Sequence, residues 1–175
     1  MPAFFFAPHG RKTLDVCHKS VTNPPSFFPP RSSAVTHPKA LVQYAALPYR
    51  MVDGHAEVML VTSRETKRWI LPKGRPEKRL KAHEVAAAEA FEEAGIVGTV
   101  VKDSFCHFAS TKRLKNGHEL PCTIKVYLLK VKKQVDEWPE KGQRERRWFT
   151  PGEAALMVTE EGLIKTLLDF GSRWV

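Results

Sequence analysis

Cysteine is scarce in this chain. The 175 residues include three cysteines, Cys17, Cys106 and Cys122, which lie far apart and form no C-x-x-C pair. An odd number of isolated cysteines favours neither a disulfide framework nor a zinc site. The sequence therefore indicates a reducing compartment, and we expect a cytoplasmic protein.

Long apolar runs are also missing. No stretch approaches the roughly 18 apolar residues that span a bilayer, so we expect a soluble protein that does not bind membranes. The apolar run at Phe4, Phe5 and Phe6 is too short for a secretory signal, and no basic residue precedes it.

Acidic residues are outnumbered. The chain has 19 Asp and Glu against 28 Lys and Arg, which gives a formal net charge of +9. Such a surface attracts phosphorylated partners. Much of the charge falls between positions 64 and 81, at Arg64, Lys67, Arg68, Lys73, Arg75, Lys78, Arg79 and Lys81. We expect a polyanion-binding surface there, with an ordinary solvated loop as the simpler alternative.

Residues 1–40 differ in composition from the rest of the chain. They hold seven prolines among scattered Phe, Ser and Thr, with neither helical nor strand periodicity. This composition predicts an irregular extension. A transit peptide, a tail that docks Phe27 and Phe28 on the domain, and a segment without function are the alternatives. Residues 41–175 are then one domain of ordinary size.

The regular part of the chain alternates strands and helices. Val42–Pro48 and Ala56–Thr62 are β-compatible and flank a turn at residues 52–55, so they predict a hairpin. The other expected strands are Trp69–Leu71, Gly98–Ala109, Cys122–Val131 and Arg146–Phe149, and the expected later helices are Pro151–Met157 and Glu160–Phe170. This order predicts an α/β fold of the α+β type, an α/β/α sandwich around a mixed β-sheet.

Residues Trp69 to Ile96 carry the most informative pattern. Lys81 to Ala94 has helix-compatible composition, and Gly95 follows as a C-terminal stop. Glu89, Glu92 and Glu93 therefore fall on one face at i, i+3 and i+4, where like charges repel. Hard carboxylate ligands of this kind suit Mg²⁺, with Mn²⁺ as the second choice. The opposite, apolar face, made by Ala87, Ala90, Phe91 and Ala94, is expected to pack on the sheet.

The spacing of six residues, Gly74, Glu89, Glu92, Glu93, Gly95 and Ile96, resembles the Nudix box, G-x5-E-x7-R-E-U-x-E-E-x-G-U. The preceding W-I-L-P-K-G also resembles the strand and loop that lead into this box. Leu80 stands where the family has its first Glu, and Ala88 where it has Arg. Both changes remove polar groups that help to position the site. Glu77 and Glu84 are candidates to replace the missing carboxylate, or are surface charges.

The resemblance implies a metal site and a reaction. Glu89, Glu93 and the backbone carbonyl of Lys73 would bind metal, and Glu92 would be a further ligand or the general base. Carboxylates and metal together suffice to hydrolyse a diphosphate, so no Ser or Cys nucleophile is required. For the glutamates alone, a solvated helix face is the simpler interpretation, and their spacing to Gly74 argues against it.

The resemblance covers Val42 to Phe170 and is closest to the diphosphoinositol polyphosphate phosphohydrolase branch, which the segment from Asp136 to Phe149 resembles. It implies substrate contacts by Thr62, Ser63, Arg64, Gly74 and Arg144, because Arg and hydroxyl groups suit phosphate. The expected activity is Mg²⁺-dependent hydrolysis of an acid anhydride in a polyphosphorylated small molecule, either a diphosphoinositol polyphosphate or a dinucleoside polyphosphate such as Ap4A or Ap6A.

Two other outcomes stay open. Capped or triphosphate-ended RNA is a third substrate class. A catalytically weakened Nudix-fold module that binds polyphosphate or RNA is the alternative from another functional class, since basic residues alone give affinity for polyanions. The loop Lys73-Gly74-Arg75-Pro76 also departs from the branch, which has a run of glycines there.

Overall fold

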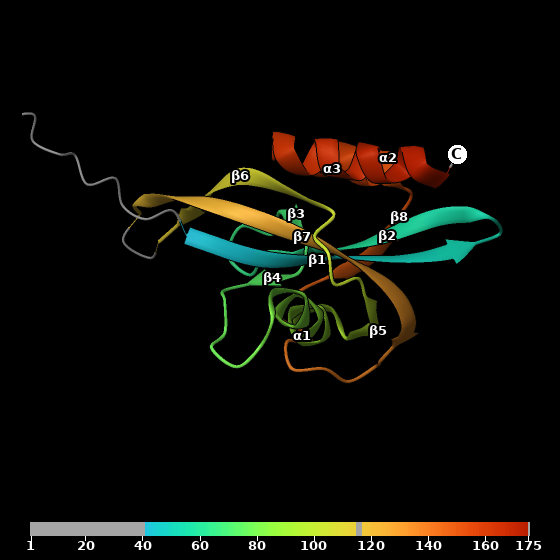
Figure 1. Cartoon of the computed structure of the whole chain (residues 1–175), viewed down its shortest axis with the longest axis horizontal. Coiled ribbons are helices and arrows are strands. Elements are labelled where there is room, and N and C mark those ends of the chain that lie inside the picture. The colour runs from blue at the N-terminus through green and yellow to red at the C-terminus, as the bar shows by residue number, and fades with distance from the viewer. Residues whose placement is uncertain (1–40, 115–116, 175) are drawn as a thin grey trace, which may run out of the picture. The chain divides into compact units, whose positions relative to one another are not determined.

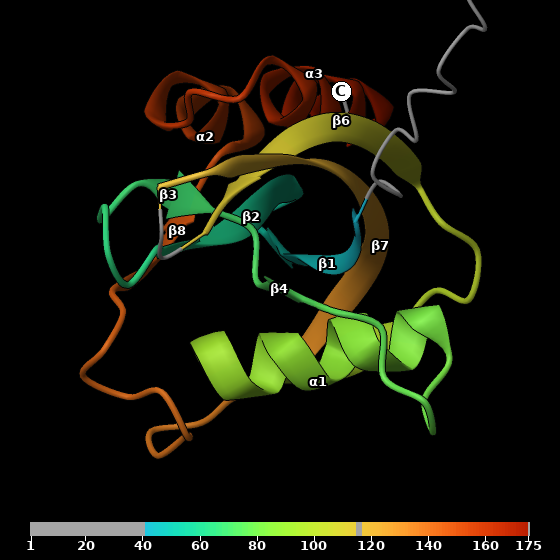
Figure 2. The same ribbon diagram turned by 90° about the vertical axis from the view of Figure 1, so that its left-hand side faces the viewer.

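The computed structural model describes residues 41–114 and 117–174, which form a mixed sheet with helices on both faces (Figure 1). Helix α1 (Ala82–Ala94) covers one face, and α2 (Pro151–Met157) with α3 (Glu161–Gly171) covers the other (Figure 2). A 3-10 turn, η1, follows at Ser172–Trp174. The predicted α/β/α sandwich is confirmed. The expected extension at residues 1–40 lies outside the described residues.

The sheet has eight strands in the described part of the chain. They are β1 (Leu41–Val52), β2 (His55–Thr62), β3 (Trp69–Ile70), β4 (Lys73–Gly74), β5 (Ile96–Val100), β6 (Cys106–Arg113), β7 (Glu119–Gln134) and β8 (Arg146–Phe149). Strands β1 and β7 pair in parallel, and every other strand pair is antiparallel. The sheet is therefore mixed, as expected.

The predicted hairpin is confirmed. Strands β1 and β2 pair up to Val52 opposite His55, and the two residues between them have positive φ angles, 49° at Asp53 and 83° at Gly54. Asp-Gly is the combination that a tight two-residue turn with positive φ requires. The chain therefore reverses where the sequence indicates.

The prediction of one strand over Gly98–Ala109 is wrong. Strand β5 pairs with the end of β7 as far as Val100 opposite Leu129, and β6 resumes with Cys106 opposite Val126. The five residues 101–105 thus oppose only two residues of β7, so they leave the ladder as an excursion. Their composition, V-K-D-S-F, includes the turn-forming pair Asp103 and Ser104.

Helix α1 matches its prediction in extent and differs in the face that it buries. Gly95 ends it with a left-handed φ of 63°, and its N–H donates to the carbonyls of the last turn. Ala86, Ala90 and Ala94 are fully buried, whereas Phe91 is 38% exposed. The expected packing of Phe91 on the sheet is therefore wrong, because the buried face is rotated toward Glu93, which is 7% exposed.

Two hydrophobic clusters hold the layers together. Leu47, Leu167 and Phe170 belong to the cluster under α2 and α3, and Met59 and Leu129 belong to the cluster under α1. The side chains that α1 contributes are mainly alanines, so this helix lies close to the sheet. None of the helices in the described residues is both long and apolar enough to cross a membrane.

Candidate active site

A single glycine brings the loop and the glutamate helix together. A Cβ atom at Gly74 would lie 1.4 Å from Oε1 of Glu89, so the carboxylate rests directly against the glycine backbone. No other residue type leaves this space. The last residue of β4 therefore lies beside the middle of α1, and the Glu89 carboxylate makes the contact between them.

Glu93 lies beneath this contact in a buried ion pair. Its Oε1 accepts a hydrogen bond from Nη2 of Arg144, and its Oε2 accepts one from the N–H of Lys73 at 3.3 Å. The Arg144 side chain is only 6% exposed and also donates to Glu140 and to the carbonyl of Thr62. A buried carboxylate is tolerated when it is paired and hydrogen-bonded in this way. The network joins α1, β4 and the end of β2.

Glu140 is a site residue for which the sequence gives little signal beyond its place in the segment from Asp136 to Phe149. Its carboxylate accepts hydrogen bonds from both Arg144 and Arg64, and its N–H donates to the carbonyl of Glu92 at 3.1 Å. The loop between β7 and β8 is thereby fixed over the last turn of α1. Glu140 connects the buried arginine to the exposed one.

Negative charge accumulates around Glu89. Burial first, and then the charges of Glu93, Glu92, Glu140 and Glu77 in that order, together raise the pKa of the Glu89 carboxyl to about 7. Burial also raises the pKa of Glu93, against the opposing effect of Arg144 and Lys73. Glu89 makes no ion pair among the described residues. Hard oxygen donors with uncompensated charge fit a divalent cation.

The three predicted carboxylates do not converge on one point. Glu89 rests on Gly74, Glu93 is held by Arg144, and Glu92 is exposed. Within residues 41–114 and 117–174, no group of three His, Cys, Asp or Glu side chains is placed to hold a metal ion. The ligand roles of Glu89, Glu92, Glu93 and the Lys73 carbonyl therefore stay predictions.

The predicted substrate residues differ in accessibility. Thr62 is 3% exposed, and its hydroxyl accepts a hydrogen bond from the N–H of Glu145. The Ser63 hydroxyl is 2.7 Å from that of Thr66, whereas the Arg64 side chain is 58% exposed. Arg144 holds Glu93 and is buried. Arg64 is therefore the accessible one of these arginines, although it pairs with Glu140, and the substrate contacts expected of all these residues stay predictions.

Neither of the two substituted box positions supplies a polar side chain, and Ala88 is half-buried on α1. Leu80 is 38% exposed and contributes no polar group. Glu84 accepts the Lys81 N–H at 2.7 Å and so caps α1. Glu77 is one of the carboxylates that raise the pKa of Glu89. Of the two candidates to replace the missing carboxylate, Glu77 is therefore the one coupled to the site.

A family profile described as NUDIX domain matches residues 43–170. The chain belongs to the Nudix family. That family generally uses a divalent metal such as Mg²⁺, which agrees with the donor set around Glu89. The glutamate helix and the glycine contact are thus the Nudix box of this chain.

The relatives with curated names are plant proteins. Nudix hydrolase 12, mitochondrial, of Arabidopsis thaliana is 32% identical over 117 residues, which are 65% of this chain and 58% of that protein. Nudix hydrolase 16, mitochondrial, of the same plant is 28% identical over 141 residues, 73% of this chain and 78% of that protein. Both names describe those proteins as Nudix hydrolases. The chain spans little more than half of the first relative.

Solved structures share the fold at low identity. The Ap4A hydrolase of C. elegans is 19% identical with a TM-score of 0.57, over 78% of this chain and 99% of that one. The NUDIX domain of Shewanella oneidensis NrtR complexed with ADP ribose is 14% identical with a TM-score of 0.59, over 78% and 89%. Both likenesses confirm the α+β Nudix fold.

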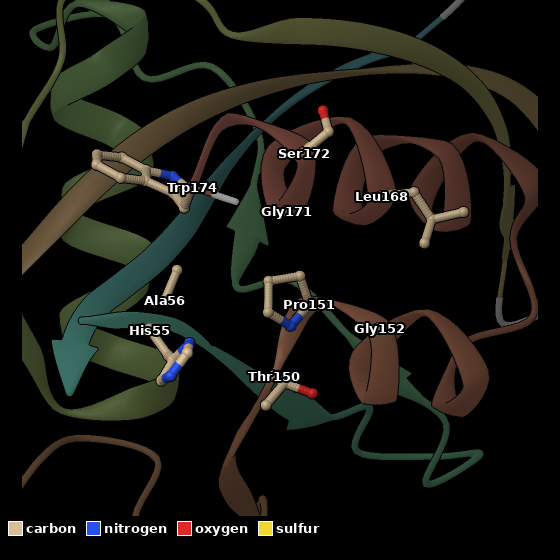
Figure 3. Close-up of a pocket in the computed structure, with 9 residues that line it drawn as sticks. All are labelled: His55, Ala56, Thr150, Pro151, Gly152, Leu168, Gly171, Ser172 and Trp174. Atoms are coloured by element: carbon tan, nitrogen blue, oxygen red, sulfur yellow. The ribbon is translucent and has the colours of Figure 1, made fainter. Parts of the chain in front are cut away.

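A separate cavity of about 360 Å³ lies on the face that carries α2 and α3 (Figure 3). His55, Pro151, Leu168 and Trp174 are among the residues that line it, and its surface is mostly apolar. None of the Nudix box residues lines this cavity. It is not part of the candidate active site.

Replacing Gly74 with Ala tests the contact with Glu89. The added methyl group must displace the Glu89 carboxylate, a flexible group, so we expect stability to change by less than about 1 kcal/mol. Misplacement of a reacting group by about 1 Å costs on the order of 100-fold in rate. Steady-state kinetics and thermal unfolding measure the two effects. Gly152→Ala is the control, since nothing lies within 4 Å of its added Cβ; equal losses in both variants would contradict this account.

Replacing Glu89 with Gln tests the raised pKa without metal. The folded-state pKa of about 7 lies above the ordinary value of 4.5, so the native chain loses stability as pH rises from about 4.5 to 7. The half-exposed position screens this effect, and we expect the variant to be about 1 kcal/mol more stable at pH 8 and nearly equal at pH 4.5. Thermal unfolding in EDTA at both pH values is the measurement. A pH-independent difference would be inconsistent with the raised pKa.

Replacing Arg144 with Gln tests the buried ion pair. The change leaves Glu93 buried without its cation, which costs about 3 kcal/mol or more. When Glu93→Gln is added to Arg144→Gln, no unpaired carboxylate is left in the interior. The double variant should therefore lose less free energy of unfolding than the two single variants together. Denaturant unfolding of all four proteins gives the coupling. Strict additivity would show that the pair contributes nothing.

Proposed function

We propose that this Nudix protein is a Mg²⁺-dependent pyrophosphohydrolase that cleaves a diphosphate linkage in a polyphosphorylated small molecule. The observation that carries the proposal is the contact of the Glu89 carboxylate with Gly74, which places uncompensated negative charge beside the buried Glu93. Divalent cations take such carboxylates together with substrate phosphate. Because the match covers 58% of the first relative, the activity of the whole protein is part of this proposal.

The proposed mechanism is hydrolysis by water at phosphorus. Glu89, Glu93 and the Lys73 carbonyl would hold the metal, which supplies charge neutralisation on the phosphate oxygens and lowers the pKa of bound water. Glu92, which is exposed, accepts the proton of the attacking water. The water oxygen bonds to phosphorus, the bridging P–O bond breaks, and two phosphate products leave. Arg144 favours the ionised form of Glu93, against the effect of burial, and orients it through its buried hydrogen bond.

The proposed substrates are diphosphoinositol polyphosphates and dinucleoside polyphosphates such as Ap4A and Ap6A. The resemblance of residues 136–149 to the diphosphoinositol polyphosphate phosphohydrolase branch supports the first class, and the fold of the C. elegans Ap4A hydrolase is compatible with the second. Arg64 is exposed near the site and offers a planar fork for phosphate. Hydrolysis of capped or triphosphate-ended RNA is the third choice.

A catalytically weakened module that binds polyphosphate or RNA is the second candidate. Ala88 cannot supply the guanidinium of the family box, and Leu80 supplies no carboxylate. Arg144 is already hydrogen-bonded to the Glu93 carboxylate. This candidate predicts polyanion affinity that does not depend on a metal.

Metal dependence separates the two candidates. Native chain and Glu92→Gln are assayed with diphosphoinositol polyphosphates, Ap4A, Ap6A and nucleoside diphosphate sugars, in Mg²⁺ and in EDTA. We expect turnover in Mg²⁺ that disappears in EDTA and falls by about 100-fold to 10,000-fold in the variant, the range for loss of a general base. Turnover that persists in EDTA would refute the mechanism. No turnover in any sample, with polyanion binding retained in EDTA, would favour the binding module.

We also propose a reducing, cytoplasmic location, which rests on the free thiols of Cys106 and Cys122. Several of the plant relatives are named mitochondrial or chloroplastic, which describes those proteins.

A further inference from the structure

The loop between β4 and α1, residues 75–81, carries four cations without ionic partners. Arg75, Lys78, Arg79 and Lys81 are exposed, and none of them forms an ion pair with another residue of the described segments. Glu77 is the one acid within this loop. We call residues 75–81 the basic loop. Its positive charge is available to an external anion.

These cations stand where they disfavour the helix that follows. The N-terminus of α1 carries the positive end of the helix dipole, where cations are unfavourable. Its N-cap residue is Lys81, which makes no side-chain capping bond, although Ser, Thr, Asp and Asn are the favoured caps. Glu84 caps the backbone N–H of Lys81, but the cationic side chain at the N-cap still breaks a local rule, as is expected at functional sites.

The basic loop begins at the candidate active site. Arg75 directly follows Gly74, whose backbone contacts the Glu89 carboxylate. From there the loop runs along the edge of the fold to the start of α1 (Figure 2). An anion that spans this loop would therefore reach from the start of α1 to Arg75, the member of the loop next to the proposed reaction centre.

The cations on the neighbouring loop between β2 and β3 are already engaged. Arg64 pairs with Glu140, Lys67 donates to the carbonyl of Gln143 at 3.1 Å, and Arg68 donates to the hydroxyl of Thr66. These bonds hold the protein's own loops together. The basic loop differs from this neighbouring loop, because its cations form no ion pair with a described residue.

We infer that the basic loop binds phosphate groups of the substrate that lie outside the cleaved linkage, so that this protein prefers substrates with longer polyphosphate chains. The inference rests on the proposed function and deepens it. Four unpaired cations within seven residues suit a compact polyanion, because charge-assisted bonds to phosphate require cations that are not already paired. Each added phosphate would gain one more contact.

The experiment compares two triple variants with equal loss of charge. The loop variant is Lys78→Gln/Arg79→Gln/Lys81→Gln. The control is Lys130→Gln/Lys132→Gln/Lys133→Gln, whose three exposed lysines lie on the part of β7 that borders β5. Each protein is assayed with Ap3A, Ap4A, Ap5A and Ap6A at constant Mg²⁺ and at two salt concentrations.

We expect kcat/KM of the native chain to rise with phosphate number. The loop variant should lose about tenfold on Ap6A through KM and less than about twofold on Ap3A, while the control stays within about twofold on both. Added salt should weaken the native preference for Ap6A. The loop variant should also melt a few degrees higher, because cations leave the helix N-terminus, so misfolding cannot imitate the result.

Equal losses on Ap3A and Ap6A, or equal losses in the control, would overturn the inference. If the native chain hydrolyses none of these substrates, the proposed function fails separately, and binding of inorganic tripolyphosphate in EDTA decides the role of the loop. Calorimetry should then show weaker binding in the loop variant than in the control. Equal affinity in the two variants would exclude the loop as a phosphate site.

Discussion

The close approach of β4 to α1 is the constraint on which the rest of the site depends. Alanines on the buried face of α1 let the helix lie near the sheet, and Gly74 then leaves only enough room for the Glu89 carboxylate. The same approach brings the N–H of Lys73 to Glu93. A larger residue at position 74 would separate the loop from the helix side chains. The close approach of β4 to α1 therefore explains why the box has glycine at this position.

Of the two glutamates at this contact, Glu93 pairs with an arginine, and Glu89 pairs with no described cation. Arg144 compensates Glu93 in the interior, whereas Glu89 forms no ion pair with a described residue and its pKa is raised to about 7. A buried pair is costly to break, so Arg144 holds the end of β2 and the last turn of α1 in place. The remaining negative charge is what a divalent metal would neutralise. Glu93 is thus held in place by Arg144, whereas the charge of Glu89 is left to an external cation.

Local signals in the sequence predict most elements but not the contacts between them. The Asp-Gly turn, the stop at Gly95 and the helix start at Pro151 depend on neighbouring residues, and all three appear as expected. The break at residues 101–105 depends on pairing with β7, and the Arg144 to Glu93 pair joins positions 51 residues apart. Neither contact has a local pattern. The box spacing therefore predicted the family without predicting what holds Glu93.

The box carboxylates are proposed to form a divalent-metal site. Electron paramagnetic resonance of Mn²⁺ measures free metal directly as it is titrated into the metal-free chain. The account predicts binding that weakens as pH falls below about 7, where Glu89 takes up a proton, and that is lost in Glu89→Gln. Absence of Mn²⁺ binding, or equal binding by native and variant chains, would contradict it.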